Sequence, residues 1–444
     1  MKTGVSVIIL TFFLSSISEF NLMAQGKIWS VDDCIKYALE QNIQILKAKV
    51  STNIDEENLL LAKAGRFPSL SGSARQSFSW SNKVNNTTGA RVFSGSNGTN
   101  ISVGSNVTLF NAYKLQNNIR KSETDYEAGK YNVEVIKENV SLSVLNAYLQ
   151  VLFAEEQVKN SANQVNSTSV QLKLAAERMK LGAIANSDYL LVKSQLATEK
   201  LTLATSQSQL EINRVTLMQF MELPVSDDFS IARPNLDSII NLKRFPSSKD
   251  VYKTALEFKP EVKNAELYKM SSQISAELAK ADYFPNVSMN AGLSTLYSGN
   301  NTVSSFGNQV NDNFSPVIGL SVAIPIYSNR QVKTRVEVAK MNTTNAELDE
   351  SNTKNVLRKE IEQACLDVTS SQIEYEASSQ QYQAEKESFD VASEKYFQGI
   401  MNSVDFLIQK TNFITAESTF LQSKFKLIFS YKILDFYMGI PLSL

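Results

Sequence analysis

The chain has 444 residues, with 44 basic and 45 acidic side chains, a formal net charge of −1 and no histidine. The balanced charge argues against a nucleic-acid partner and against a polybasic surface for anionic lipid. The lack of histidine removes the commonest general base and the commonest transition-metal ligand. We therefore expect no catalytic, cofactor or metal site.

The first 24 residues predict a secretory signal peptide. Lys2 provides a basic start, residues 5–14 an apolar segment, and Leu22-Met23-Ala24 a cleavage site. The apolar segment is shorter than the about 20 residues that a membrane-spanning helix needs. We expect the mature protein to leave the cytoplasm and, with no cysteine directly after the cleavage site, to lack a lipid anchor.

The chain contains two copies of one structural unit. Residues 33–224 align with residues 250–441 without a gap at a single offset (250 − 33 = 217). The predicted organisation is a first repeat at 25–224, a linker at 225–247 and a second repeat at 248–444. The matching pairs include Ala38-Leu39-Glu40 with Ala255-Leu256-Glu257, Phe67-Pro68 with Phe284-Pro285, Gly182 with Gly399, and Asp188 with Asp405.

Two cysteines, Cys34 and Cys365, align with Val251 and Tyr148 in the other copy. Both positions are therefore expected to be packing sites. A disulfide between the two cysteines remains an alternative in an oxidising compartment.

Each repeat opens with a predicted helix, at residues 31–64 and 248–281. Asp32 and Asp33 lie near the positive end of the first helix. Each helix ends before a Phe-Pro pair, because proline bars further helix and favours extended backbone.

Four strands are predicted to follow, two in each repeat. Residues 287–297, 318–326 and 101–109 alternate apolar with small polar residues, whereas residues 70–80 alternate poorly. Alternation over about ten residues is typical of a transmembrane β-strand, with Trp80 and Tyr297 at the strand ends as an aromatic girdle. Residues 81–99 and 298–316 are expected to be exposed loops. A soluble β-sandwich is the alternative, but four strands flanked by very long helices cannot form its core.

A long helical hairpin closes each repeat. Residues 112–181 predict one helix of about 105 Å, and Gly182 and Gly399 mark the two turns. Sustained heptad spacing predicts coiled-coil packing, with a row of small residues that lets neighbouring backbones approach closely. In the first repeat the large rows are Val144, Val151, Val158, Val165, Leu172, Met179 before the turn and Tyr189, Leu196, Leu203, Leu210, Leu217 after it. The small row of the first repeat is Ala147, Ala154, Ser161, Thr168, Ala175. In the second repeat the large rows are Ile361, Val368, Tyr375, Tyr382, Phe389, Tyr396 before the turn and Phe406, Phe413, Phe420, Leu427, Leu434 after it.

Four strands cannot close a barrel, and an open sheet edge cannot lie in lipid. The chain must therefore form an oligomer if its strands cross a membrane. Two copies would give a barrel filled by its own side chains, whereas three copies would give twelve strands and an open passage. The predicted fold is mainly α with a transmembrane β part, assembled as a homotrimer whose 12-stranded β-barrel continues into an α-helical barrel.

These features together resemble the TolC family of outer-membrane efflux channels across nearly the whole mature chain. The resemblance rests on segments whose order and spacing fit the family: Trp29-Ser30-Val31-Asp32-Asp33, Ala38-Leu39-Glu40-Gln41-Asn42, Phe67-Pro68, Leu109-Phe110-Asn111, Leu181-Gly182-Ala183, Ile324-Pro325-Ile326-Tyr327 and Gly399 to Asp405. It implies a trimer in outer-membrane lipid that reaches across the periplasm. Its partners would be a periplasmic adaptor and an inner-membrane transporter.

The resemblance also implies functional residues at the helical tips. Asp188 and Tyr396 match the acid and the tyrosine of a closed-state network, and Asp405 matches a ring of acids at the constriction. Two departures weaken the usual charge latch, because Met401 and Ile408 stand at positions that are usually charged. The expected adaptor-docking residues are Leu181, Gly182, Ala183, Gly399 and Ile400.

Simpler interpretations of the same residues stay open. Asp188 and Asp405 could stabilise the start of the returning helix, and Tyr396 could be a core residue of its heptad row. The favoured function is a passive exit duct gated at the tips. A non-channel periplasmic coiled-coil adaptor or structural protein is the alternative, and an exported hydrolase lacks a nucleophile–base pair. The cargo, whether drug, metal or protein, is left open.

Overall fold

The computed structural model describes residues 27–84, 89–226, 228–234, 246–299 and 303–442. The predicted signal peptide and parts of the linker lie outside these residues. The chain folds into two compact units. Of the described residues, the helical unit takes those within 27–48, 133–259 and 354–442, and the strand unit takes those within 49–132 and 260–353.

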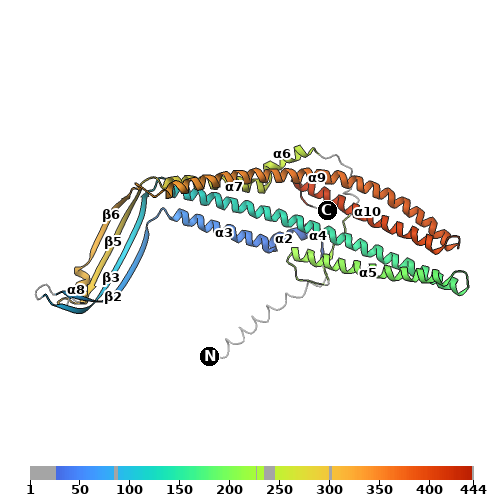
Figure 1. The fold of residues 1–444 in the computed structure, drawn as a ribbon, viewed down its shortest axis with the longest axis horizontal. Helices are drawn as coiled ribbons and strands as arrows, with labels where there is room; N and C mark the ends of the chain where they lie inside the picture. The colour runs from blue at the N-terminus through green and yellow to red at the C-terminus, as the bar shows by residue number, and fades with distance from the viewer. Residues whose placement is uncertain (1–26, 85–88, 227, 235–245, 300–302, 443–444) are drawn as a thin grey trace, which may run out of the picture. The chain divides into compact units, whose positions relative to one another are not determined.

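The sequence duplication is reproduced in the helices (Figure 1). Each helix of the first repeat has a partner of the same length that begins 217 residues later, as in 331 − 114 = 217. The first four helices are α2 (Val31–Gln41), α3 (Ile43–Ala64), α4 (Lys114–Lys180) and α5 (Asn186–Phe220), and their partners are α6 (Ser248–Phe258), α7 (Pro260–Ala281), α9 (Gln331–Phe397) and α10 (Ser403–Tyr437).

The prediction of a single opening helix is wrong in both repeats. The first breaks at Asn42, whose backbone is extended at φ −61° and ψ 127°. The Asn42 side chain accepts a hydrogen bond from the Gln44 amide (2.9 Å) and donates one to the Phe220 carbonyl (2.9 Å). It thereby caps α3 and fixes the break against α5. The second breaks at Lys259, because a residue before proline disfavours helical backbone.

Four strands form one antiparallel sheet in the order β2-β3-β5-β6. This order places the two strands of the first repeat beside the two strands of the second. The outer strands of the sheet, β2 and β6, each have one edge without a partner in the sheet. The strands are β2 (Ser69–Val84), β3 (Arg91–Phe110), β5 (Asn286–Ser298) and β6 (Ser315–Ala323).

The predicted loops are shorter than expected. Residues 81–84 and 91–99 are strand, because β2 and β3 pair without interruption from Ser69 with Asn106 to Val84 with Arg91. The second loop contains a short helix, α8 (Phe306–Asp312), capped by Ser305. The α8 segment packs on β5, where the Tyr297 and Phe306 rings lie 4.9 Å apart. β6 ends at Ala323 rather than 326, since Pro325 cannot donate a ladder hydrogen bond.

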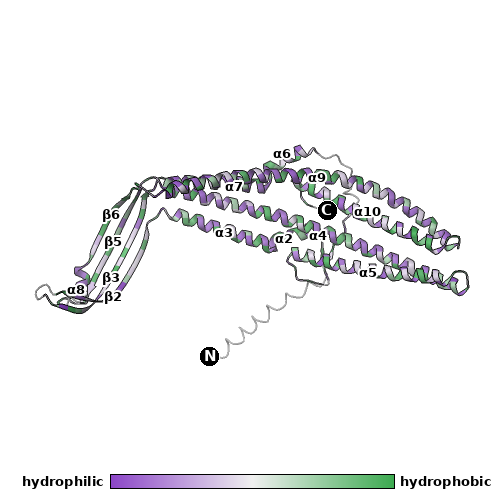
Figure 2. Ribbon diagram, viewed as in Figure 1, coloured by the Kyte–Doolittle hydropathy of each residue, from purple (hydrophilic) through white to green (hydrophobic). Residues whose placement is uncertain are grey.

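The register divides the sheet into two faces. Directly paired residues share a face, so the serines at alternate positions of β2 lie with Ser102, Asn106, Ser288 and Asn290 on what we call the polar face. β2 alternates better than its sequence suggested, because small residues obscure the pattern. Figure 2 shows polar and apolar positions mixed along all four strands. The opposite, apolar face carries Leu70, Phe78, Trp80, Ile101, Val103, Met289, Leu293, Tyr297, Ile318, Leu320 and Val322.

A second, very small sheet was not predicted. In the helical unit, β1 (Ile28–Trp29) pairs in parallel with β4 (Ser230–Ile231). The buried Tyr148 hydroxyl lies 3.2 Å from the Trp29 carbonyl oxygen and 2.6 Å from that of Ala232. Tyr148 therefore joins this sheet to α4 in the main core of the helical unit. Among the described residues, no helix is both long enough and apolar enough to span a membrane.

Candidate functional site

The helical hairpins end in two turns of the same design. α4 turns into α5 at Gly182, and α9 turns into α10 at Gly399, with φ of +73° and +79°. Ala183 donates its amide proton to the Arg178 carbonyl (2.9 Å), and Ile400 donates to the Lys395 carbonyl (2.9 Å). These are the closing hydrogen bonds of a helix C-terminal motif that needs left-handed backbone, which glycine adopts without strain. Both predicted turns are confirmed.

Inside the second hairpin, aromatic rings interleave along the seam between α9 and α10. The rings of Tyr382 and Phe420 lie 5.1 Å apart at 9°, those of Phe389 and Phe413 5.0 Å apart at 5°, and those of Tyr396 and Phe406 4.5 Å apart at 14°. The corresponding rows of the first hairpin are mainly aliphatic. We call this set the aromatic ladder: Tyr375, Tyr382, Phe389, Tyr396, Phe406, Phe413 and Phe420.

The predicted small row is the most deeply buried row of α4. All five of its members, from Ala147 to Ala175, are buried. In both hairpins a serine of this row meets a serine of the returning helix, Ser161 with Ser206 (3.3 Å) and Ser378 with Ser423 (2.5 Å). These four residues keep the offset of 217 (378 − 161 and 423 − 206), so each hairpin has the same internal packing register.

Towards the tips, polar groups join the two hairpins, whereas nearer the main core the rings of Phe153 on α4 and Phe425 on α10 meet edge to face, 5.8 Å apart. Lys410 of α10 forms an ion pair with Glu199 of α5, with Nζ 2.7 Å from Oε1. The two side chains are 3% and 5% exposed. Thr168 of α4 donates a hydrogen bond to Glu199 and accepts one from Lys410. Burial lowers the Lys410 pKa from its ordinary value, although the hydrogen bond and charge of Glu199 oppose this shift. We call these three residues the inter-hairpin triad.

A second polar layer lies one heptad further along α10. Glu417 takes a hydrogen bond from Gln164 of α4, and burial raises the pKa of its carboxyl. Apolar rows thus hold the helices of each hairpin together, and polar groups join the two hairpins in the half nearer the tips. A polar contact needs its partner at a defined distance and angle, so separation of the hairpins breaks discrete interactions.

Arg178 makes a third link, at the tip itself. Its guanidinium, on the last turn of α4, donates to the carbonyl oxygens of Tyr396 (2.9 Å) and Phe397 (2.5 Å) at the end of α9. A cation beside the carbonyls that end a helix is favourable, because those carbonyls carry the negative end of the helix dipole. Arg178 also lies against the Tyr396 ring, 5.7 Å from its centroid.

The predicted gate residues are not joined to one another within one chain. Asp188 is half-buried in the first turn of α5, and within the described part of the chain its carboxylate has no hydrogen-bond or ion-pair partner. Tyr396 is buried in the aromatic ladder. Asp405 is exposed in the first turn of α10, where Asn402 donates to its carboxylate (2.7 Å) and accepts from its amide (2.8 Å). Helix capping and core packing thus account for Asp405 and Tyr396 within one chain.

Met401 and Ile408 occupy the two tip positions that are usually charged. Met401 packs against the buried cluster of Ala392, Tyr396 and Phe406, and Ile408 is exposed. An apolar contact thus stands where a charge was expected. Of the predicted docking residues, Leu181 and Ile400 are strongly exposed, at 82% and 71%.

Arg178, Glu199 and Lys410 were not predicted from the sequence. A signal was present, because Glu199 lies seven residues after the buried Val192 and Lys410 lies seven after the buried Ser403. A charged residue on a buried heptad row requires a partner. The heptad pattern does not identify that partner, which is 211 positions away (410 − 199).

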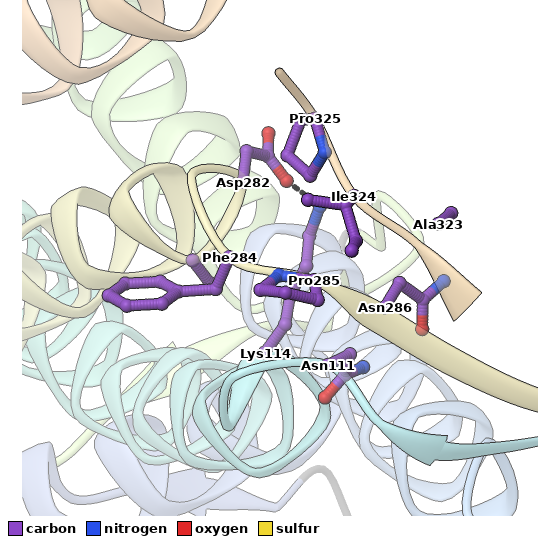
Figure 3. Close-up of a pocket in the computed structure, with 10 residues that line it drawn as sticks. Asn111, Lys114, Asp282, Phe284, Pro285, Asn286, Ala323, Ile324 and Pro325 are labelled. Atoms are coloured by element: carbon purple, nitrogen blue, oxygen red, sulfur yellow. Dashed lines mark hydrogen bonds and ion pairs between the residues drawn. The ribbon is translucent and has the colours of Figure 1, made fainter.

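The strand unit contains a pocket of about 390 Å³ where strands meet helices. Lys114 and Asp282 form an ion pair in this pocket, with Nζ 2.5 Å from Oδ1. Figure 3 shows the Lys114 side chain extending to Asp282. Asp282 also binds Arg335 (2.7 Å), so one carboxylate joins the starts of α4 and α9 to the end of α7. The pocket is lined by Asn111, Lys114, Ala281, Asp282, Phe284, Pro285, Asn286, Ala323, Ile324 and Pro325. Three of these residues, Asn111, Ile324 and Pro325, belong to segments on which the family resemblance rests.

A family model described as outer membrane efflux protein matches residues 34–221 and 251–439. The two matched segments cover most of the chain and start 217 residues apart (251 − 34). The chain therefore belongs to the outer membrane efflux protein family. None of the curated proteins compared matches its sequence.

Several solved structures have the same fold. The CmeC outer membrane channel of Campylobacter jejuni aligns with a TM-score of 0.80 at 19% identity, over 93% of this chain and 87% of that one. CusC, in structures that concern folding and transmembrane channel formation, gives 0.80 at 16% identity, over 93% and 92%. The outer membrane protein VceC of Vibrio cholerae gives 0.77 at 13% identity, over 93% and 97%. At these identities the likeness establishes the fold.

Proposed function

We propose that this chain is the outer membrane channel of a tripartite efflux or type I secretion system. Three copies would form a passive exit duct across the outer membrane and the periplasm. A periplasmic adaptor and an inner-membrane transporter would be its partners and would supply the energy. The family assignment does not favour the alternative of a non-channel adaptor.

The observation that carries the proposal is the four-stranded sheet with two open edges and one exposed apolar face. Leu70 and Ile318, on the two edge strands, are both 76% exposed. Exposed apolar surface of this extent marks contact with protein or lipid. Backbone groups at an open edge need partners in lipid, and β6 of one copy beside β2 of the next would supply them. Closure of three four-stranded sheets gives twelve strands.

Gating is proposed at the hairpin tips. The apolar rows make each hairpin a single body, and the polar layers between the hairpins near the tips are the contacts that opening would break there. Arg178 and the inter-hairpin triad would hold the tips together within one chain. In a trimer, Asp188 and Asp405 would face neighbouring copies near the axis, and Tyr396 would support the tip from within the aromatic ladder. Leu181, Gly182, Ala183, Gly399 and Ile400 would meet the adaptor.

Extraction from membranes and conductance together test the proposal. The full-length protein should separate with outer membranes, run as a trimer after detergent extraction and form conducting pores in a planar bilayer. Monomeric, non-conducting protein recovered without detergent would contradict it. Co-purification with native partners would then identify the adaptor and the transporter.

A further inference from the structure

We propose that the polar face of the sheet makes the strand end of this duct prefer anionic solutes, through the uncompensated charge of Arg75. The inference rests on the proposed function, because it takes the polar face as the lining of the passage. It concerns the class of solute, which neither the family nor the fold decides.

Within the four described strands, the polar face carries no acidic residue. Along β2 the polar face presents Ser69, Ser71, Ser73, Arg75, Ser77, Ser79 and Ser81, opposite serine, asparagine and glycine of β3. None of the four strands contains aspartate or glutamate. By register the charged residues of this face are Arg75, in the middle of β2, and Lys83, near its end, and both are basic.

No neighbouring group neutralises Arg75. Its side chain is exposed, and within the described part of the chain it has no ion-pair partner. It stands opposite Asn100 in the register. On either side along β2, Ser73 bonds to Ser102 (2.9 Å) and Ser77 to the Gly98 carbonyl (3.3 Å). The flanking hydroxyls are thus engaged within the sheet, which leaves the guanidinium to solvent.

Assembly would not supply an acid either. Arg75 lies on an edge strand, and closure would bring β6 of the next copy beside it. β6 (Ser315–Ala323) contains no charged residue. Three copies would therefore place three guanidinium groups at one height of the passage. A guanidinium binds carboxylates and phosphates in a fork-like geometry, so small organic anions are the solutes that this ring favours.

The test is ion selectivity in a planar bilayer at about 10 mM salt, where screening extends over about 30 Å. The reversal potential across a potassium chloride gradient gives the chloride-to-potassium permeability ratio. We expect Arg75→Gln to lower this ratio by about two-fold, which is the effect of one unit charge on an ion about 10 Å away in water. Arg75→Glu should lower it further, whereas Arg75→Lys should preserve it. Acetate in place of chloride should give the same order of variants.

The matched control is Arg91→Gln, which removes an exposed arginine from the apolar face of the same sheet. It should leave the ratio unchanged. Acids at the helical tips contribute equally to every variant, so they cancel in the comparison. Should Arg75→Gln fail to assemble, Ser79→Glu places an opposing charge on the same face and should also lower the ratio.

Equal ratios for the parent and the Arg75 variants would overturn this inference while leaving a conducting channel. The same holds if Arg91→Gln has as large an effect as Arg75→Gln. A parent protein that does not conduct at all would instead overturn the proposed function.

Discussion

Lys410 and Glu199, on helices of different hairpins, form an ion pair of 2.7 Å in which both side chains are almost fully buried. Removing one member of a buried pair leaves the other charge without compensation. We expect Lys410→Met to lower the free energy of unfolding by roughly 3 kcal/mol. In the channel, it should also raise the open probability, because the hairpins lose a link. Thermal unfolding and single-channel recording measure the two effects.

The double variant Lys410→Met, Glu199→Met should recover most of the lost stability, since two apolar side chains need no partner. Lys426→Met is the control, because Lys426 pairs with Glu374 at the surface of the second hairpin (2.7 Å). It should change stability by less than about 1 kcal/mol. A double variant no more stable than the single variant would show that the unpaired charge of Glu199 is not the cause of the lost stability.

Arg178→Gln should loosen the end of α9. The variant loses the charged donor to the Tyr396 and Phe397 carbonyls, at a cost of about 1–2 kcal/mol for a half-exposed group. Amide hydrogen exchange at residues 398–401 should accelerate. Lys180→Gln, two residues away, removes only an exposed ion pair with Glu177 and should leave exchange unchanged. Equal exchange in both variants would assign no tip role to Arg178.

Cys34 predicts a loss of stability at alkaline pH. Burial raises the pKa of its thiol from 9.0 to about 12. Below pH 9.0 both states hold the proton and the group has no effect. Between these values the unfolded state loses its proton while the folded state keeps it, so stability falls as pH rises, by up to about 1.4 kcal/mol per pH unit.

The reference for that measurement is Cys34→Val, because Val251 fills the equivalent buried position in the second repeat. Denaturation midpoints of the parent should fall more steeply above pH 9.0 than those of the variant. Parallel curves would contradict the prediction. Cys34 should also resist alkylation until the protein unfolds.

Ala112 has left-handed backbone at the junction between β3 and α4, with φ of 52°. Its equivalent in the second repeat, Asn329, has φ of 46°. Asparagine tolerates this backbone, whereas a β-branched side chain clashes. Ala112→Asn should therefore be nearly neutral in thermal unfolding, while Ala112→Val should cost about 1–2 kcal/mol. Similar melting temperatures for both variants would mean that the junction relaxes.

The sequence predicted those features that depend on local periodicity. The heptad rows gave the hairpins and their glycine turns, and the offset of 217 holds for every long helix. The break at Asn42 was not predicted, because the apolar spacing continues across it and the cause is a tertiary hydrogen bond to Phe220. α8 escaped because its residues are mostly polar and it is held by contacts with β5. The Glu199–Lys410 pair escaped because periodicity says which residues are buried, not which distant residue they meet.

The aromatic ladder has a mechanical consequence. Interleaved flat rings have few rotamers and resist sliding of one helix along another, whereas aliphatic side chains repack more freely. The second hairpin is therefore the stiffer of the two. In the proposed trimer, stiff and flexible hairpins would alternate around the ring, and twisting strain would concentrate in the aliphatic hairpins.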